Sequence, residues 1–149
     1  MLATAAVKHK GTILVVDDSP EMQRYFRFLL ELNAYQVETA DNGLEALERL
    51  HGGCSPDAVI LDLQMPYLDG LRTLQRLLKL RPGLKVIMCS GVSDPWKAQQ
   101  ATALGAEAYL VKPVQQLYLT AALDRCLKSE TEKKSAPART TALSATRPQ

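Results

Sequence analysis

The sequence predicts an α/β protein, a doubly wound, five-stranded parallel sheet with helices on both of its faces. Short strand-like runs, most of them almost entirely apolar, begin near residues 13, 36, 58, 85 and 107. Such runs are typical of strands that are buried on both faces of a parallel sheet. The intervals of 22 to 27 residues between them each leave room for one helix and two short loops. Because crossovers between parallel strands are right-handed, this alternation places helices on both faces.

The first two helices are predicted from their capping residues. Ser19 followed by Pro20 marks the start of the first helix, since a hydroxyl group caps a helix and proline suits its first position. The apolar stripe of this helix is Met22, Phe26, Leu29 and Leu30. The second helix is expected over residues 43–51, with Asn42 before it as the cap and Gly52-Gly53 after it as the stop.

Leucine spacing and further capping residues predict the other three helices. The third helix carries an apolar stripe and ends before Arg81-Pro82-Gly83. Its stripe is Leu71, Leu74, Leu77 and Leu78. The fourth helix begins at Asp94-Pro95 and ends at Gly105, and the fifth follows Pro113 and continues to about Lys128.

The composition predicts one globular domain, residues 12–128, between a short N-terminal arm, residues 1–11, and a disordered basic tail, residues 129–149. With 46% hydrophobic and 23% charged residues, the chain of 149 residues is ordinary for a globular protein. The tail accounts for the whole net charge of +2, so the rest of the chain is close to neutral. It therefore lacks the basic surface of a protein that binds nucleic acid or an anionic membrane.

The cysteines and the apolar runs indicate a cytoplasmic protein. Cys54, Cys89 and Cys126 are widely spaced and form no metal-binding or disulfide pattern, so we expect reduced thiols. The longest apolar runs are too short for a membrane span, and residues 2–7 are too short for the apolar core of a signal peptide.

Polar residues follow four of the predicted strands at the point where each strand ends. Asp17 and Asp18 follow the first strand, Asp62 closes the third, Ser90 closes the fourth and Lys112 follows the fifth. The carboxyl ends of parallel strands share the edge of the sheet where open α/β folds bind ligands. We therefore expect these five side chains to form one site.

Three carboxylates, a hydroxyl group and an ammonium group suit a divalent metal ion and a phosphoryl group. Two unit charges about 4 Å apart repel by roughly 4 kcal/mol at an effective dielectric constant of 20, so the carboxylates favour a cation such as Mg²⁺. Asp62 can serve both as a metal ligand and as a nucleophile that forms an acyl phosphate. Mg²⁺ and Lys112 would neutralise the phosphoryl charge, and Ser90 could donate a hydrogen bond to it. The alternatives are a helix cap for Asp18 and a solvated surface lysine for Lys112.

These residues resemble the receiver domain of two-component response regulators, of the single-domain, chemotaxis-regulator-like kind, over about residues 12–128. The matching segments are Val15-Val16-Asp17-Asp18-Ser19, Asp62-Leu63-Gln64-Met65-Pro66 with Asp69-Gly70, Ser90-Gly91, and Tyr109-Leu110-Val111-Lys112-Pro113. The resemblance implies a flavodoxin-like (βα)5 fold with strand order 2-1-3-4-5. It also implies a cis peptide bond between Lys112 and Pro113.

The resemblance further implies a role for each residue of the site. Asp62 would be the phosphoacceptor, and it would act in catalysis together with Lys112 and Ser90. The implied Mg²⁺ ligands are Asp17, Asp18, Asp62 and the backbone carbonyl of Gln64. Ser90 would be the switch hydroxyl and Tyr109 the switch aromatic residue.

The expected function is that of a phosphorylation-dependent signalling switch, which accepts a phosphoryl group from a histidine kinase or phosphotransfer protein. We do not expect an enzyme: the protein would catalyse only its own phosphoryl uptake and slow autodephosphorylation. Because only the short tail follows the domain, we expect output through protein–protein contacts, with no direct binding of nucleic acid or membrane. The contact face would comprise the fourth helix, fifth strand and fifth helix, where Trp96 is either a core residue or an exposed anchor. The sequence leaves open whether phosphorylation also drives homodimerisation.

Two alternatives stay open at this point. The chain could be a receiver fragment of a larger regulator or hybrid kinase, or a Mg²⁺-dependent phosphatase of the haloacid-dehalogenase type. That phosphatase family places a second aspartate two residues after its nucleophile, at the end of the first strand. Here Gln64 stands at that position and Asp62 closes the third strand, which favours the receiver.

Overall fold

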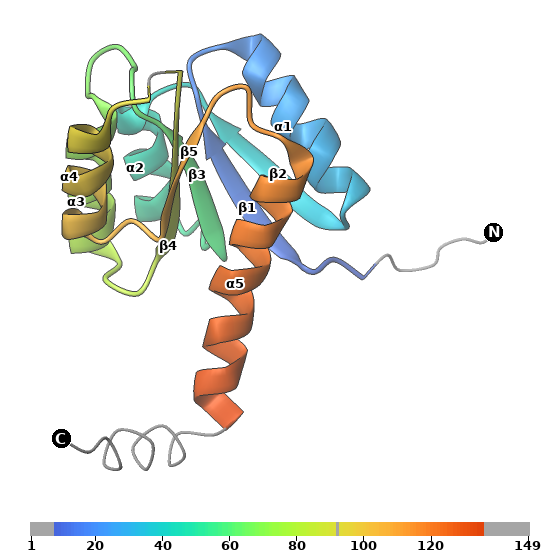
Figure 1. The fold of residues 1–149 in the computed structure, drawn as a ribbon. Helices are drawn as coiled ribbons and strands as arrows, with labels where there is room; N and C mark the ends of the chain where they lie inside the picture. Colours follow the sequence, from blue (N-terminus) through green and yellow to red (C-terminus); the bar gives the residue numbers. More distant parts are fainter. Residues whose placement is uncertain (1–7, 92, 136–149) are drawn as a thin grey trace, which may run out of the picture.

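A five-stranded parallel sheet lies between two layers of helices (Figure 1) in the computed structural model, which describes residues 8–91 and 93–135. The strands are β1 (Gly11–Val16), β2 (Tyr35–Ala40), β3 (Ala58–Asp62), β4 (Lys85–Ser90) and β5 (Ala108–Val111). Their order across the sheet is β2-β1-β3-β4-β5, and every neighbouring pair is parallel. The predicted fold class and strand order are confirmed.

Within the described residues five helices alternate with the strands, and the first, second and fourth begin directly after their predicted caps. They are α1 (Pro20–Leu32), α2 (Gly43–His51), α3 (Gly70–Leu80), α4 (Pro95–Leu104) and α5 (Gln116–Ser135). The side chains of Ser19, Asn42 and Asp94 each accept a hydrogen bond from a backbone amide in the first turn of α1, α2 and α4. Each cap satisfies an amide that the helix itself leaves without a partner.

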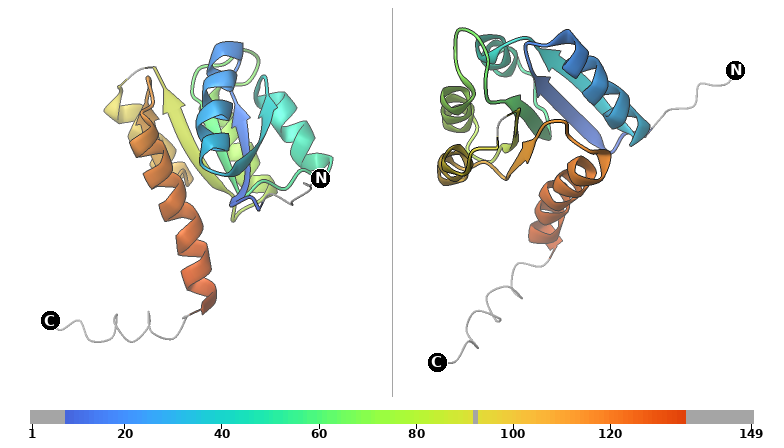
Figure 2. Two further views of the ribbon diagram at one scale, coloured as in Figure 1. Left: turned by 90° about the vertical axis from the view of Figure 1, so that its right-hand side faces the viewer. Right: turned by 45° about the horizontal axis from the view of Figure 1, so that its top comes forward.

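The sheet separates two hydrophobic cores because successive residues of a strand point to opposite faces. Ile13 and Val15 of β1 pack on the side of α1 and α5, whereas Leu14 and Val16 pack on the side of α2, α3 and α4. Figure 2 shows the same two layers from other directions. Both faces of the central strands are covered, which explains why each of these strands contains a run of consecutive apolar residues instead of an alternation of apolar and polar ones.

The last helix ends later than the sequence analysis predicted. The expected end was about Lys128, but α5 continues to Ser135, and its last turns project beyond the sheet (Figure 2). Residues 129–135 contain neither glycine nor proline, and glutamate and lysine, which favour helix, make up most of them. The predicted disorder is therefore wrong for this segment.

The outer parts of the predicted arm and tail, residues 1–7 and 136–149, lie outside the described residues. The proposed boundaries of the arm and the tail stay predictions there. β1 begins at Gly11, two residues before the strand start expected near residue 13 and one residue before the expected start of the domain. Within the described residues, none of the helices combines the length and the hydrophobicity that a membrane span requires.

Candidate functional site

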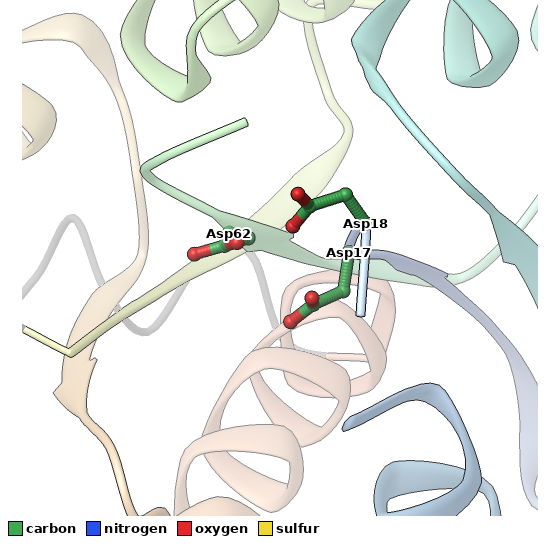
Figure 3. A group of neighbouring side chains, drawn as sticks. All are labelled: Asp17, Asp18 and Asp62. Atoms are coloured by element: carbon green, nitrogen blue, oxygen red, sulfur yellow. The ribbon is translucent and has the colours of Figure 1, made fainter. Parts of the chain in front are cut away.

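The predicted polar residues meet at the carboxyl edge of the sheet. β1 and β3 are neighbours, and Val16 pairs with Leu61, so the next residues along the two strands, Asp17 and Asp62, are level with each other. Figure 3 shows Asp17 and Asp18 at the end of β1 beside Asp62 at the end of β3. The topology therefore brings together side chains that the sequence places far apart.

The three aspartates form a compact group of carboxylates. Each offers a carboxylate oxygen, and these oxygens all lie within 4.8 Å of one another. Asp17 and Asp62 are almost completely buried, and Asp18 is exposed. Burial raises the pKa of the Asp62 carboxyl, and the charge of Asp17 raises it further, although Lys112 acts in the opposite direction. The ionised form of Asp62 is therefore held at a free-energy cost.

Lys112 is the cation of the site. Its ammonium group lies 2.9 Å from Oδ2 of Asp17 and 3.3 Å from Oδ1 of Asp62, so it bridges the two buried carboxylates. Burial lowers the pKa of Lys112, but the hydrogen bond to Asp17 and the charges of both aspartates outweigh burial and raise it overall. The lysine therefore stays charged, and the alternative of a solvated surface lysine is wrong.

The backbone of Lys112 is held at β4. Its amide donates a hydrogen bond of 2.7 Å to the carbonyl of Ser90, the last residue of that strand. The peptide bond to Pro113 is cis, which confirms the expectation from the resemblance. The hydrogen bond to Ser90 holds the backbone from which the Lys112 side chain reaches Asp62 at the end of β3.

Hydrogen bonds that the sequence did not reveal fix the loop that carries Asp17. The amide of Ser19 donates to Oδ1 of Asp17 at 2.9 Å. The side-chain amide of Gln23, on α1, donates to the backbone carbonyl of Asp17 at 2.7 Å and to the carboxylate of Asp41 at 2.8 Å. Gln23 thus ties the loop after β1 to the loop after β2. A polar residue on the half-buried side of α1, next to Met22, was the signal that could have identified it.

A glycine allows the first turn of α3 to pack directly on the backbone of the site. The amide of Gly70 donates to the carbonyl of Leu63 at 2.8 Å. A Cβ atom at Gly70 would lie 2.5 Å from the carbonyl oxygen of Asp62 and 2.6 Å from the Cα atom of Leu63. Both distances are impossibly short, so only glycine fits here. Asp69, just before it, caps α3 by accepting from the amide of Arg72 at 2.8 Å.

The remaining predicted residues lie around this centre. Ser90 is fully buried at the end of β4, and the half-buried Tyr109 packs against the core on the side of α4. The amide of Gln64 donates a long hydrogen bond of 3.4 Å to Oδ1 of Asp62. Trp96 is 66% exposed, so the alternative of a core residue is wrong. Ala101 is the buried residue of α4, which explains why the side chain of Trp96 can point to solvent.

The donor set of this site matches a hard divalent cation. All candidate ligands are oxygens, which Mg²⁺ prefers over nitrogen or sulfur. Three carboxylates against the one ammonium group of Lys112 leave an excess of negative charge in the described part of the site. A cation held next to a nucleophilic carboxylate would also bind the oxygens of a phosphoryl group.

The comparisons with known proteins agree with this geometry. The family model of the response regulator receiver domain matches residues 13–124. The chemotaxis protein CheY of Listeria monocytogenes is 34% identical over 117 residues, which cover 78% of this chain and 98% of the relative. The chemotaxis protein CheY of Halobacterium salinarum is 34% identical over 104 residues, covering 70% and 86%. A solved receiver domain protein from Clostridium thermocellum matches with a TM-score of 0.76 at 34% identity, covering 80% of this chain and 96% of that one.

Proposed function

The chain belongs to the response regulator receiver domain family, and we propose that it accepts a phosphoryl group on Asp62. Receiver domains of CheY-like regulators are phosphorylation-dependent signalling proteins and not classical enzymes. One observation supports Asp62 above the other carboxylates of the group. Asp62 closes β3, the middle strand of the sheet, whereas both carboxylate oxygens of Asp17 accept hydrogen bonds within the protein, Oδ1 from the amide of Ser19 and Oδ2 from the ammonium group of Lys112.

In the proposed reaction a carboxylate oxygen of Asp62 attacks the phosphorus atom of a phosphohistidine. The P–N bond breaks, the imidazole leaves with the bonding electron pair, and Asp62 becomes an acyl phosphate. Burial raises the pKa of Asp62, and a more basic carboxylate is a better nucleophile. Lys112 is close enough to contact the incoming phosphoryl oxygens and to stabilise their charge in the transition state.

We propose Mg²⁺ as the cofactor, held by Asp17, Asp18, Asp62 and the backbone carbonyl of Gln64. Receiver domains generally bind Mg²⁺ at an acidic pocket, and the clustered carboxylates of this chain fit that requirement. When bound, the ion supplies positive charge that neutralises the phosphoryl oxygens. The excess negative charge of the site is the physical reason to expect a divalent cation instead of a second lysine.

For partners, receiver domains interact with histidine kinases or phosphotransfer proteins and with downstream targets. We propose that this chain takes its phosphoryl group from such a donor and contacts its target through α4, β5 and α5. The exposed side chains of Trp96 and Val111 support this face, since each leaves apolar surface open to a partner. Ser90 and Tyr109 are the proposed link between the phosphoryl group and this face.

Phosphorylation with a small donor tests the assignment. Acetyl phosphate with Mg²⁺ should label the protein at one acid-stable, base-labile position, and Asp62→Asn should take up no label. A chelator of divalent cations should stop labelling of the unmodified chain. Asp57→Asn, which changes the exposed aspartate just before β3, is the matched control and should label normally. Equal labelling of the Asp62→Asn protein would contradict the proposal.

A further inference from the structure

We propose that the hydroxyl group of Tyr25 positions Lys112 for phosphoryl uptake. Tyr25 lies on α1, and its hydroxyl donates a hydrogen bond to the backbone carbonyl of Val114. Val114 follows Lys112 by two residues in the loop between β5 and α5. Figure 1 shows this loop beside α1, so the hydrogen bond joins the first helix of the fold to the segment that carries the lysine. The inference rests on the proposed role of Lys112 at Asp62.

The Tyr25 hydroxyl group provides the second of two hydrogen bonds that hold the backbone of residues 112–114. On the strand side, the amide of Lys112 donates to the carbonyl of Ser90 at 2.7 Å. On the helix side, the side chain of Val114 is buried in the core between the sheet, α1 and α5, and its carbonyl accepts from Tyr25. The backbone of residues 112–114 is therefore held from both ends, one end through β4 and the other through α1.

The anchor matters because lysine has a long side chain with many rotamers. Its ammonium group must stay near two carboxylates at once, 2.9 Å from Asp17 and 3.3 Å from Asp62. A shift of the supporting backbone moves the start of that side chain, and errors of about 1 Å in the placement of a catalytic group slow reactions by up to roughly 100-fold. The contacts that hold the backbone of Lys112 therefore also keep its ammonium group in place.

The hydroxyl group, more than the ring, gives Tyr25 this role. The residue is 38% exposed, whereas the next residue, Phe26, is fully buried and supplies the packing of that turn. A phenylalanine at position 25 would keep the ring and its contacts but would leave the carbonyl of Val114 without this donor. Tyr25→Phe therefore removes the tether with little change to the core.

A double-mutant cycle tests the inference. Labelling rates with acetyl phosphate and Mg²⁺ are compared for the unmodified chain, Tyr25→Phe, Lys112→Ala and the double variant. Losing one hydrogen bond should slow labelling roughly threefold to tenfold in Tyr25→Phe. If the hydroxyl acts through the lysine, the same change should have no further effect once Lys112 is alanine. Tyr67→Phe, at a tyrosine that is 82% exposed, is the control and should label at the unmodified rate.

Two results would overturn the inference. One is an unchanged rate in Tyr25→Phe, and the other is an equal slowing with and without Lys112, which would indicate a merely structural effect. If Lys112→Ala labels as fast as the unmodified chain, the proposed function of the lysine fails instead.

A second measurement needs no phosphoryl group. The exchange of the Lys112 ammonium protons with water, followed by NMR, should become roughly threefold to tenfold faster in Tyr25→Phe because the ion pair forms less persistently. Unchanged exchange would overturn the tether even if labelling fails altogether, and faster exchange would support it.

Discussion

The two ends of β3 carry an aspartate each, and the two are used in opposite ways. Asp57, just before the strand, is exposed and exchanges two hydrogen bonds of 2.8 Å with the backbone of Thr12 on β1. Asp62, at the other end, is 6% exposed and faces a second buried carboxylate and a lysine. The same residue type at the same strand therefore stabilises the fold at one edge and holds unfavourable charge at the other.

The lysines of the two edges are similarly buried but differ in their partners. Lys85, at the start of β4, pairs across 3.7 Å with the exposed carboxylate of Glu107, and ion pairs that water can reach contribute about 0–1 kcal/mol. Lys112, at the opposite edge, lies among carboxylates that are buried. Polar groups at the amino edge thus satisfy the backbone and each other. Those at the carboxyl edge are arranged for a ligand that brings additional charge.

The sharpest test of this contrast removes one lysine from each edge. Lys112→Ala should slow labelling by acetyl phosphate on the order of 100-fold, because a fixed positive charge next to the phosphoryl oxygens is lost. Lys85→Ala should leave the labelling rate unchanged, although it removes a lysine of the same sheet. Initial rates under identical Mg²⁺ concentrations measure both. A comparable loss in the two variants would show that the lysines act through the fold and not through the site.

A smaller effect should distinguish the aspartates by stability. The pKa of Asp62 is raised above its ordinary value of 3.8, first by burial, so the folded protein binds this proton more tightly than the unfolded chain does. The contribution of this carboxyl to the free energy of unfolding therefore falls as the pH rises from 3.8 to the pKa of the folded protein, and it stays low above that pH. Asp62→Asn removes the charge, so without Mg²⁺ at neutral pH its melting temperature should rise.

The size and pH dependence of this rise are both measurable. Each kcal/mol gained corresponds to about 2 to 4 °C in a chain of this length. The gain should shrink as the pH is lowered toward 3.8, where the unmodified carboxyl is protonated too. Asp57→Asn should show no gain, since its carboxylate is exposed and already hydrogen-bonded. A melting temperature that falls in Asp62→Asn at neutral pH would mean that the contact with Lys112 outweighs burial.

Much of the fold and the centre of the site followed from the sequence because strong local rules apply there. Apolar runs set the strands, Ser19, Asn42 and Asp94 set the helix starts, and the shared edge of parallel strands gathered Asp17, Asp62 and Lys112. Each rule depends on residue type and position along the chain. A single sequence is sufficient for such rules.

The supporting contacts did not follow from the sequence, because they depend on how elements pack. The hydrogen bonds from Gln23 to Asp17 and from Tyr25 to Val114 connect a side chain to a backbone carbonyl, which any residue offers. No pattern of residue types identifies the acceptor. The end of α5 was missed for another reason: beyond the sheet, helix propensity alone decides, and the charged composition of residues 129–135 resembles that of a tail.

The smallest predicted effect asks whether the charge at the carboxyl edge is transmitted to the face of α4, β5 and α5. Beryllofluoride with Mg²⁺ mimics the phosphoryl group at Asp62, and it should draw the Ser90 hydroxyl inward and leave space for the ring of Tyr109. A ligand shifts such an equilibrium only by its different affinities for the two conformations. Trp96 is 66% exposed without the ligand, so repacking of this face should move its fluorescence to shorter wavelength. Ser90→Ala should reduce that shift while Mg²⁺ still binds, because the aspartates remain. An equal shift in Ser90→Ala would mean that the signal leaves the site by a route that does not use this hydroxyl.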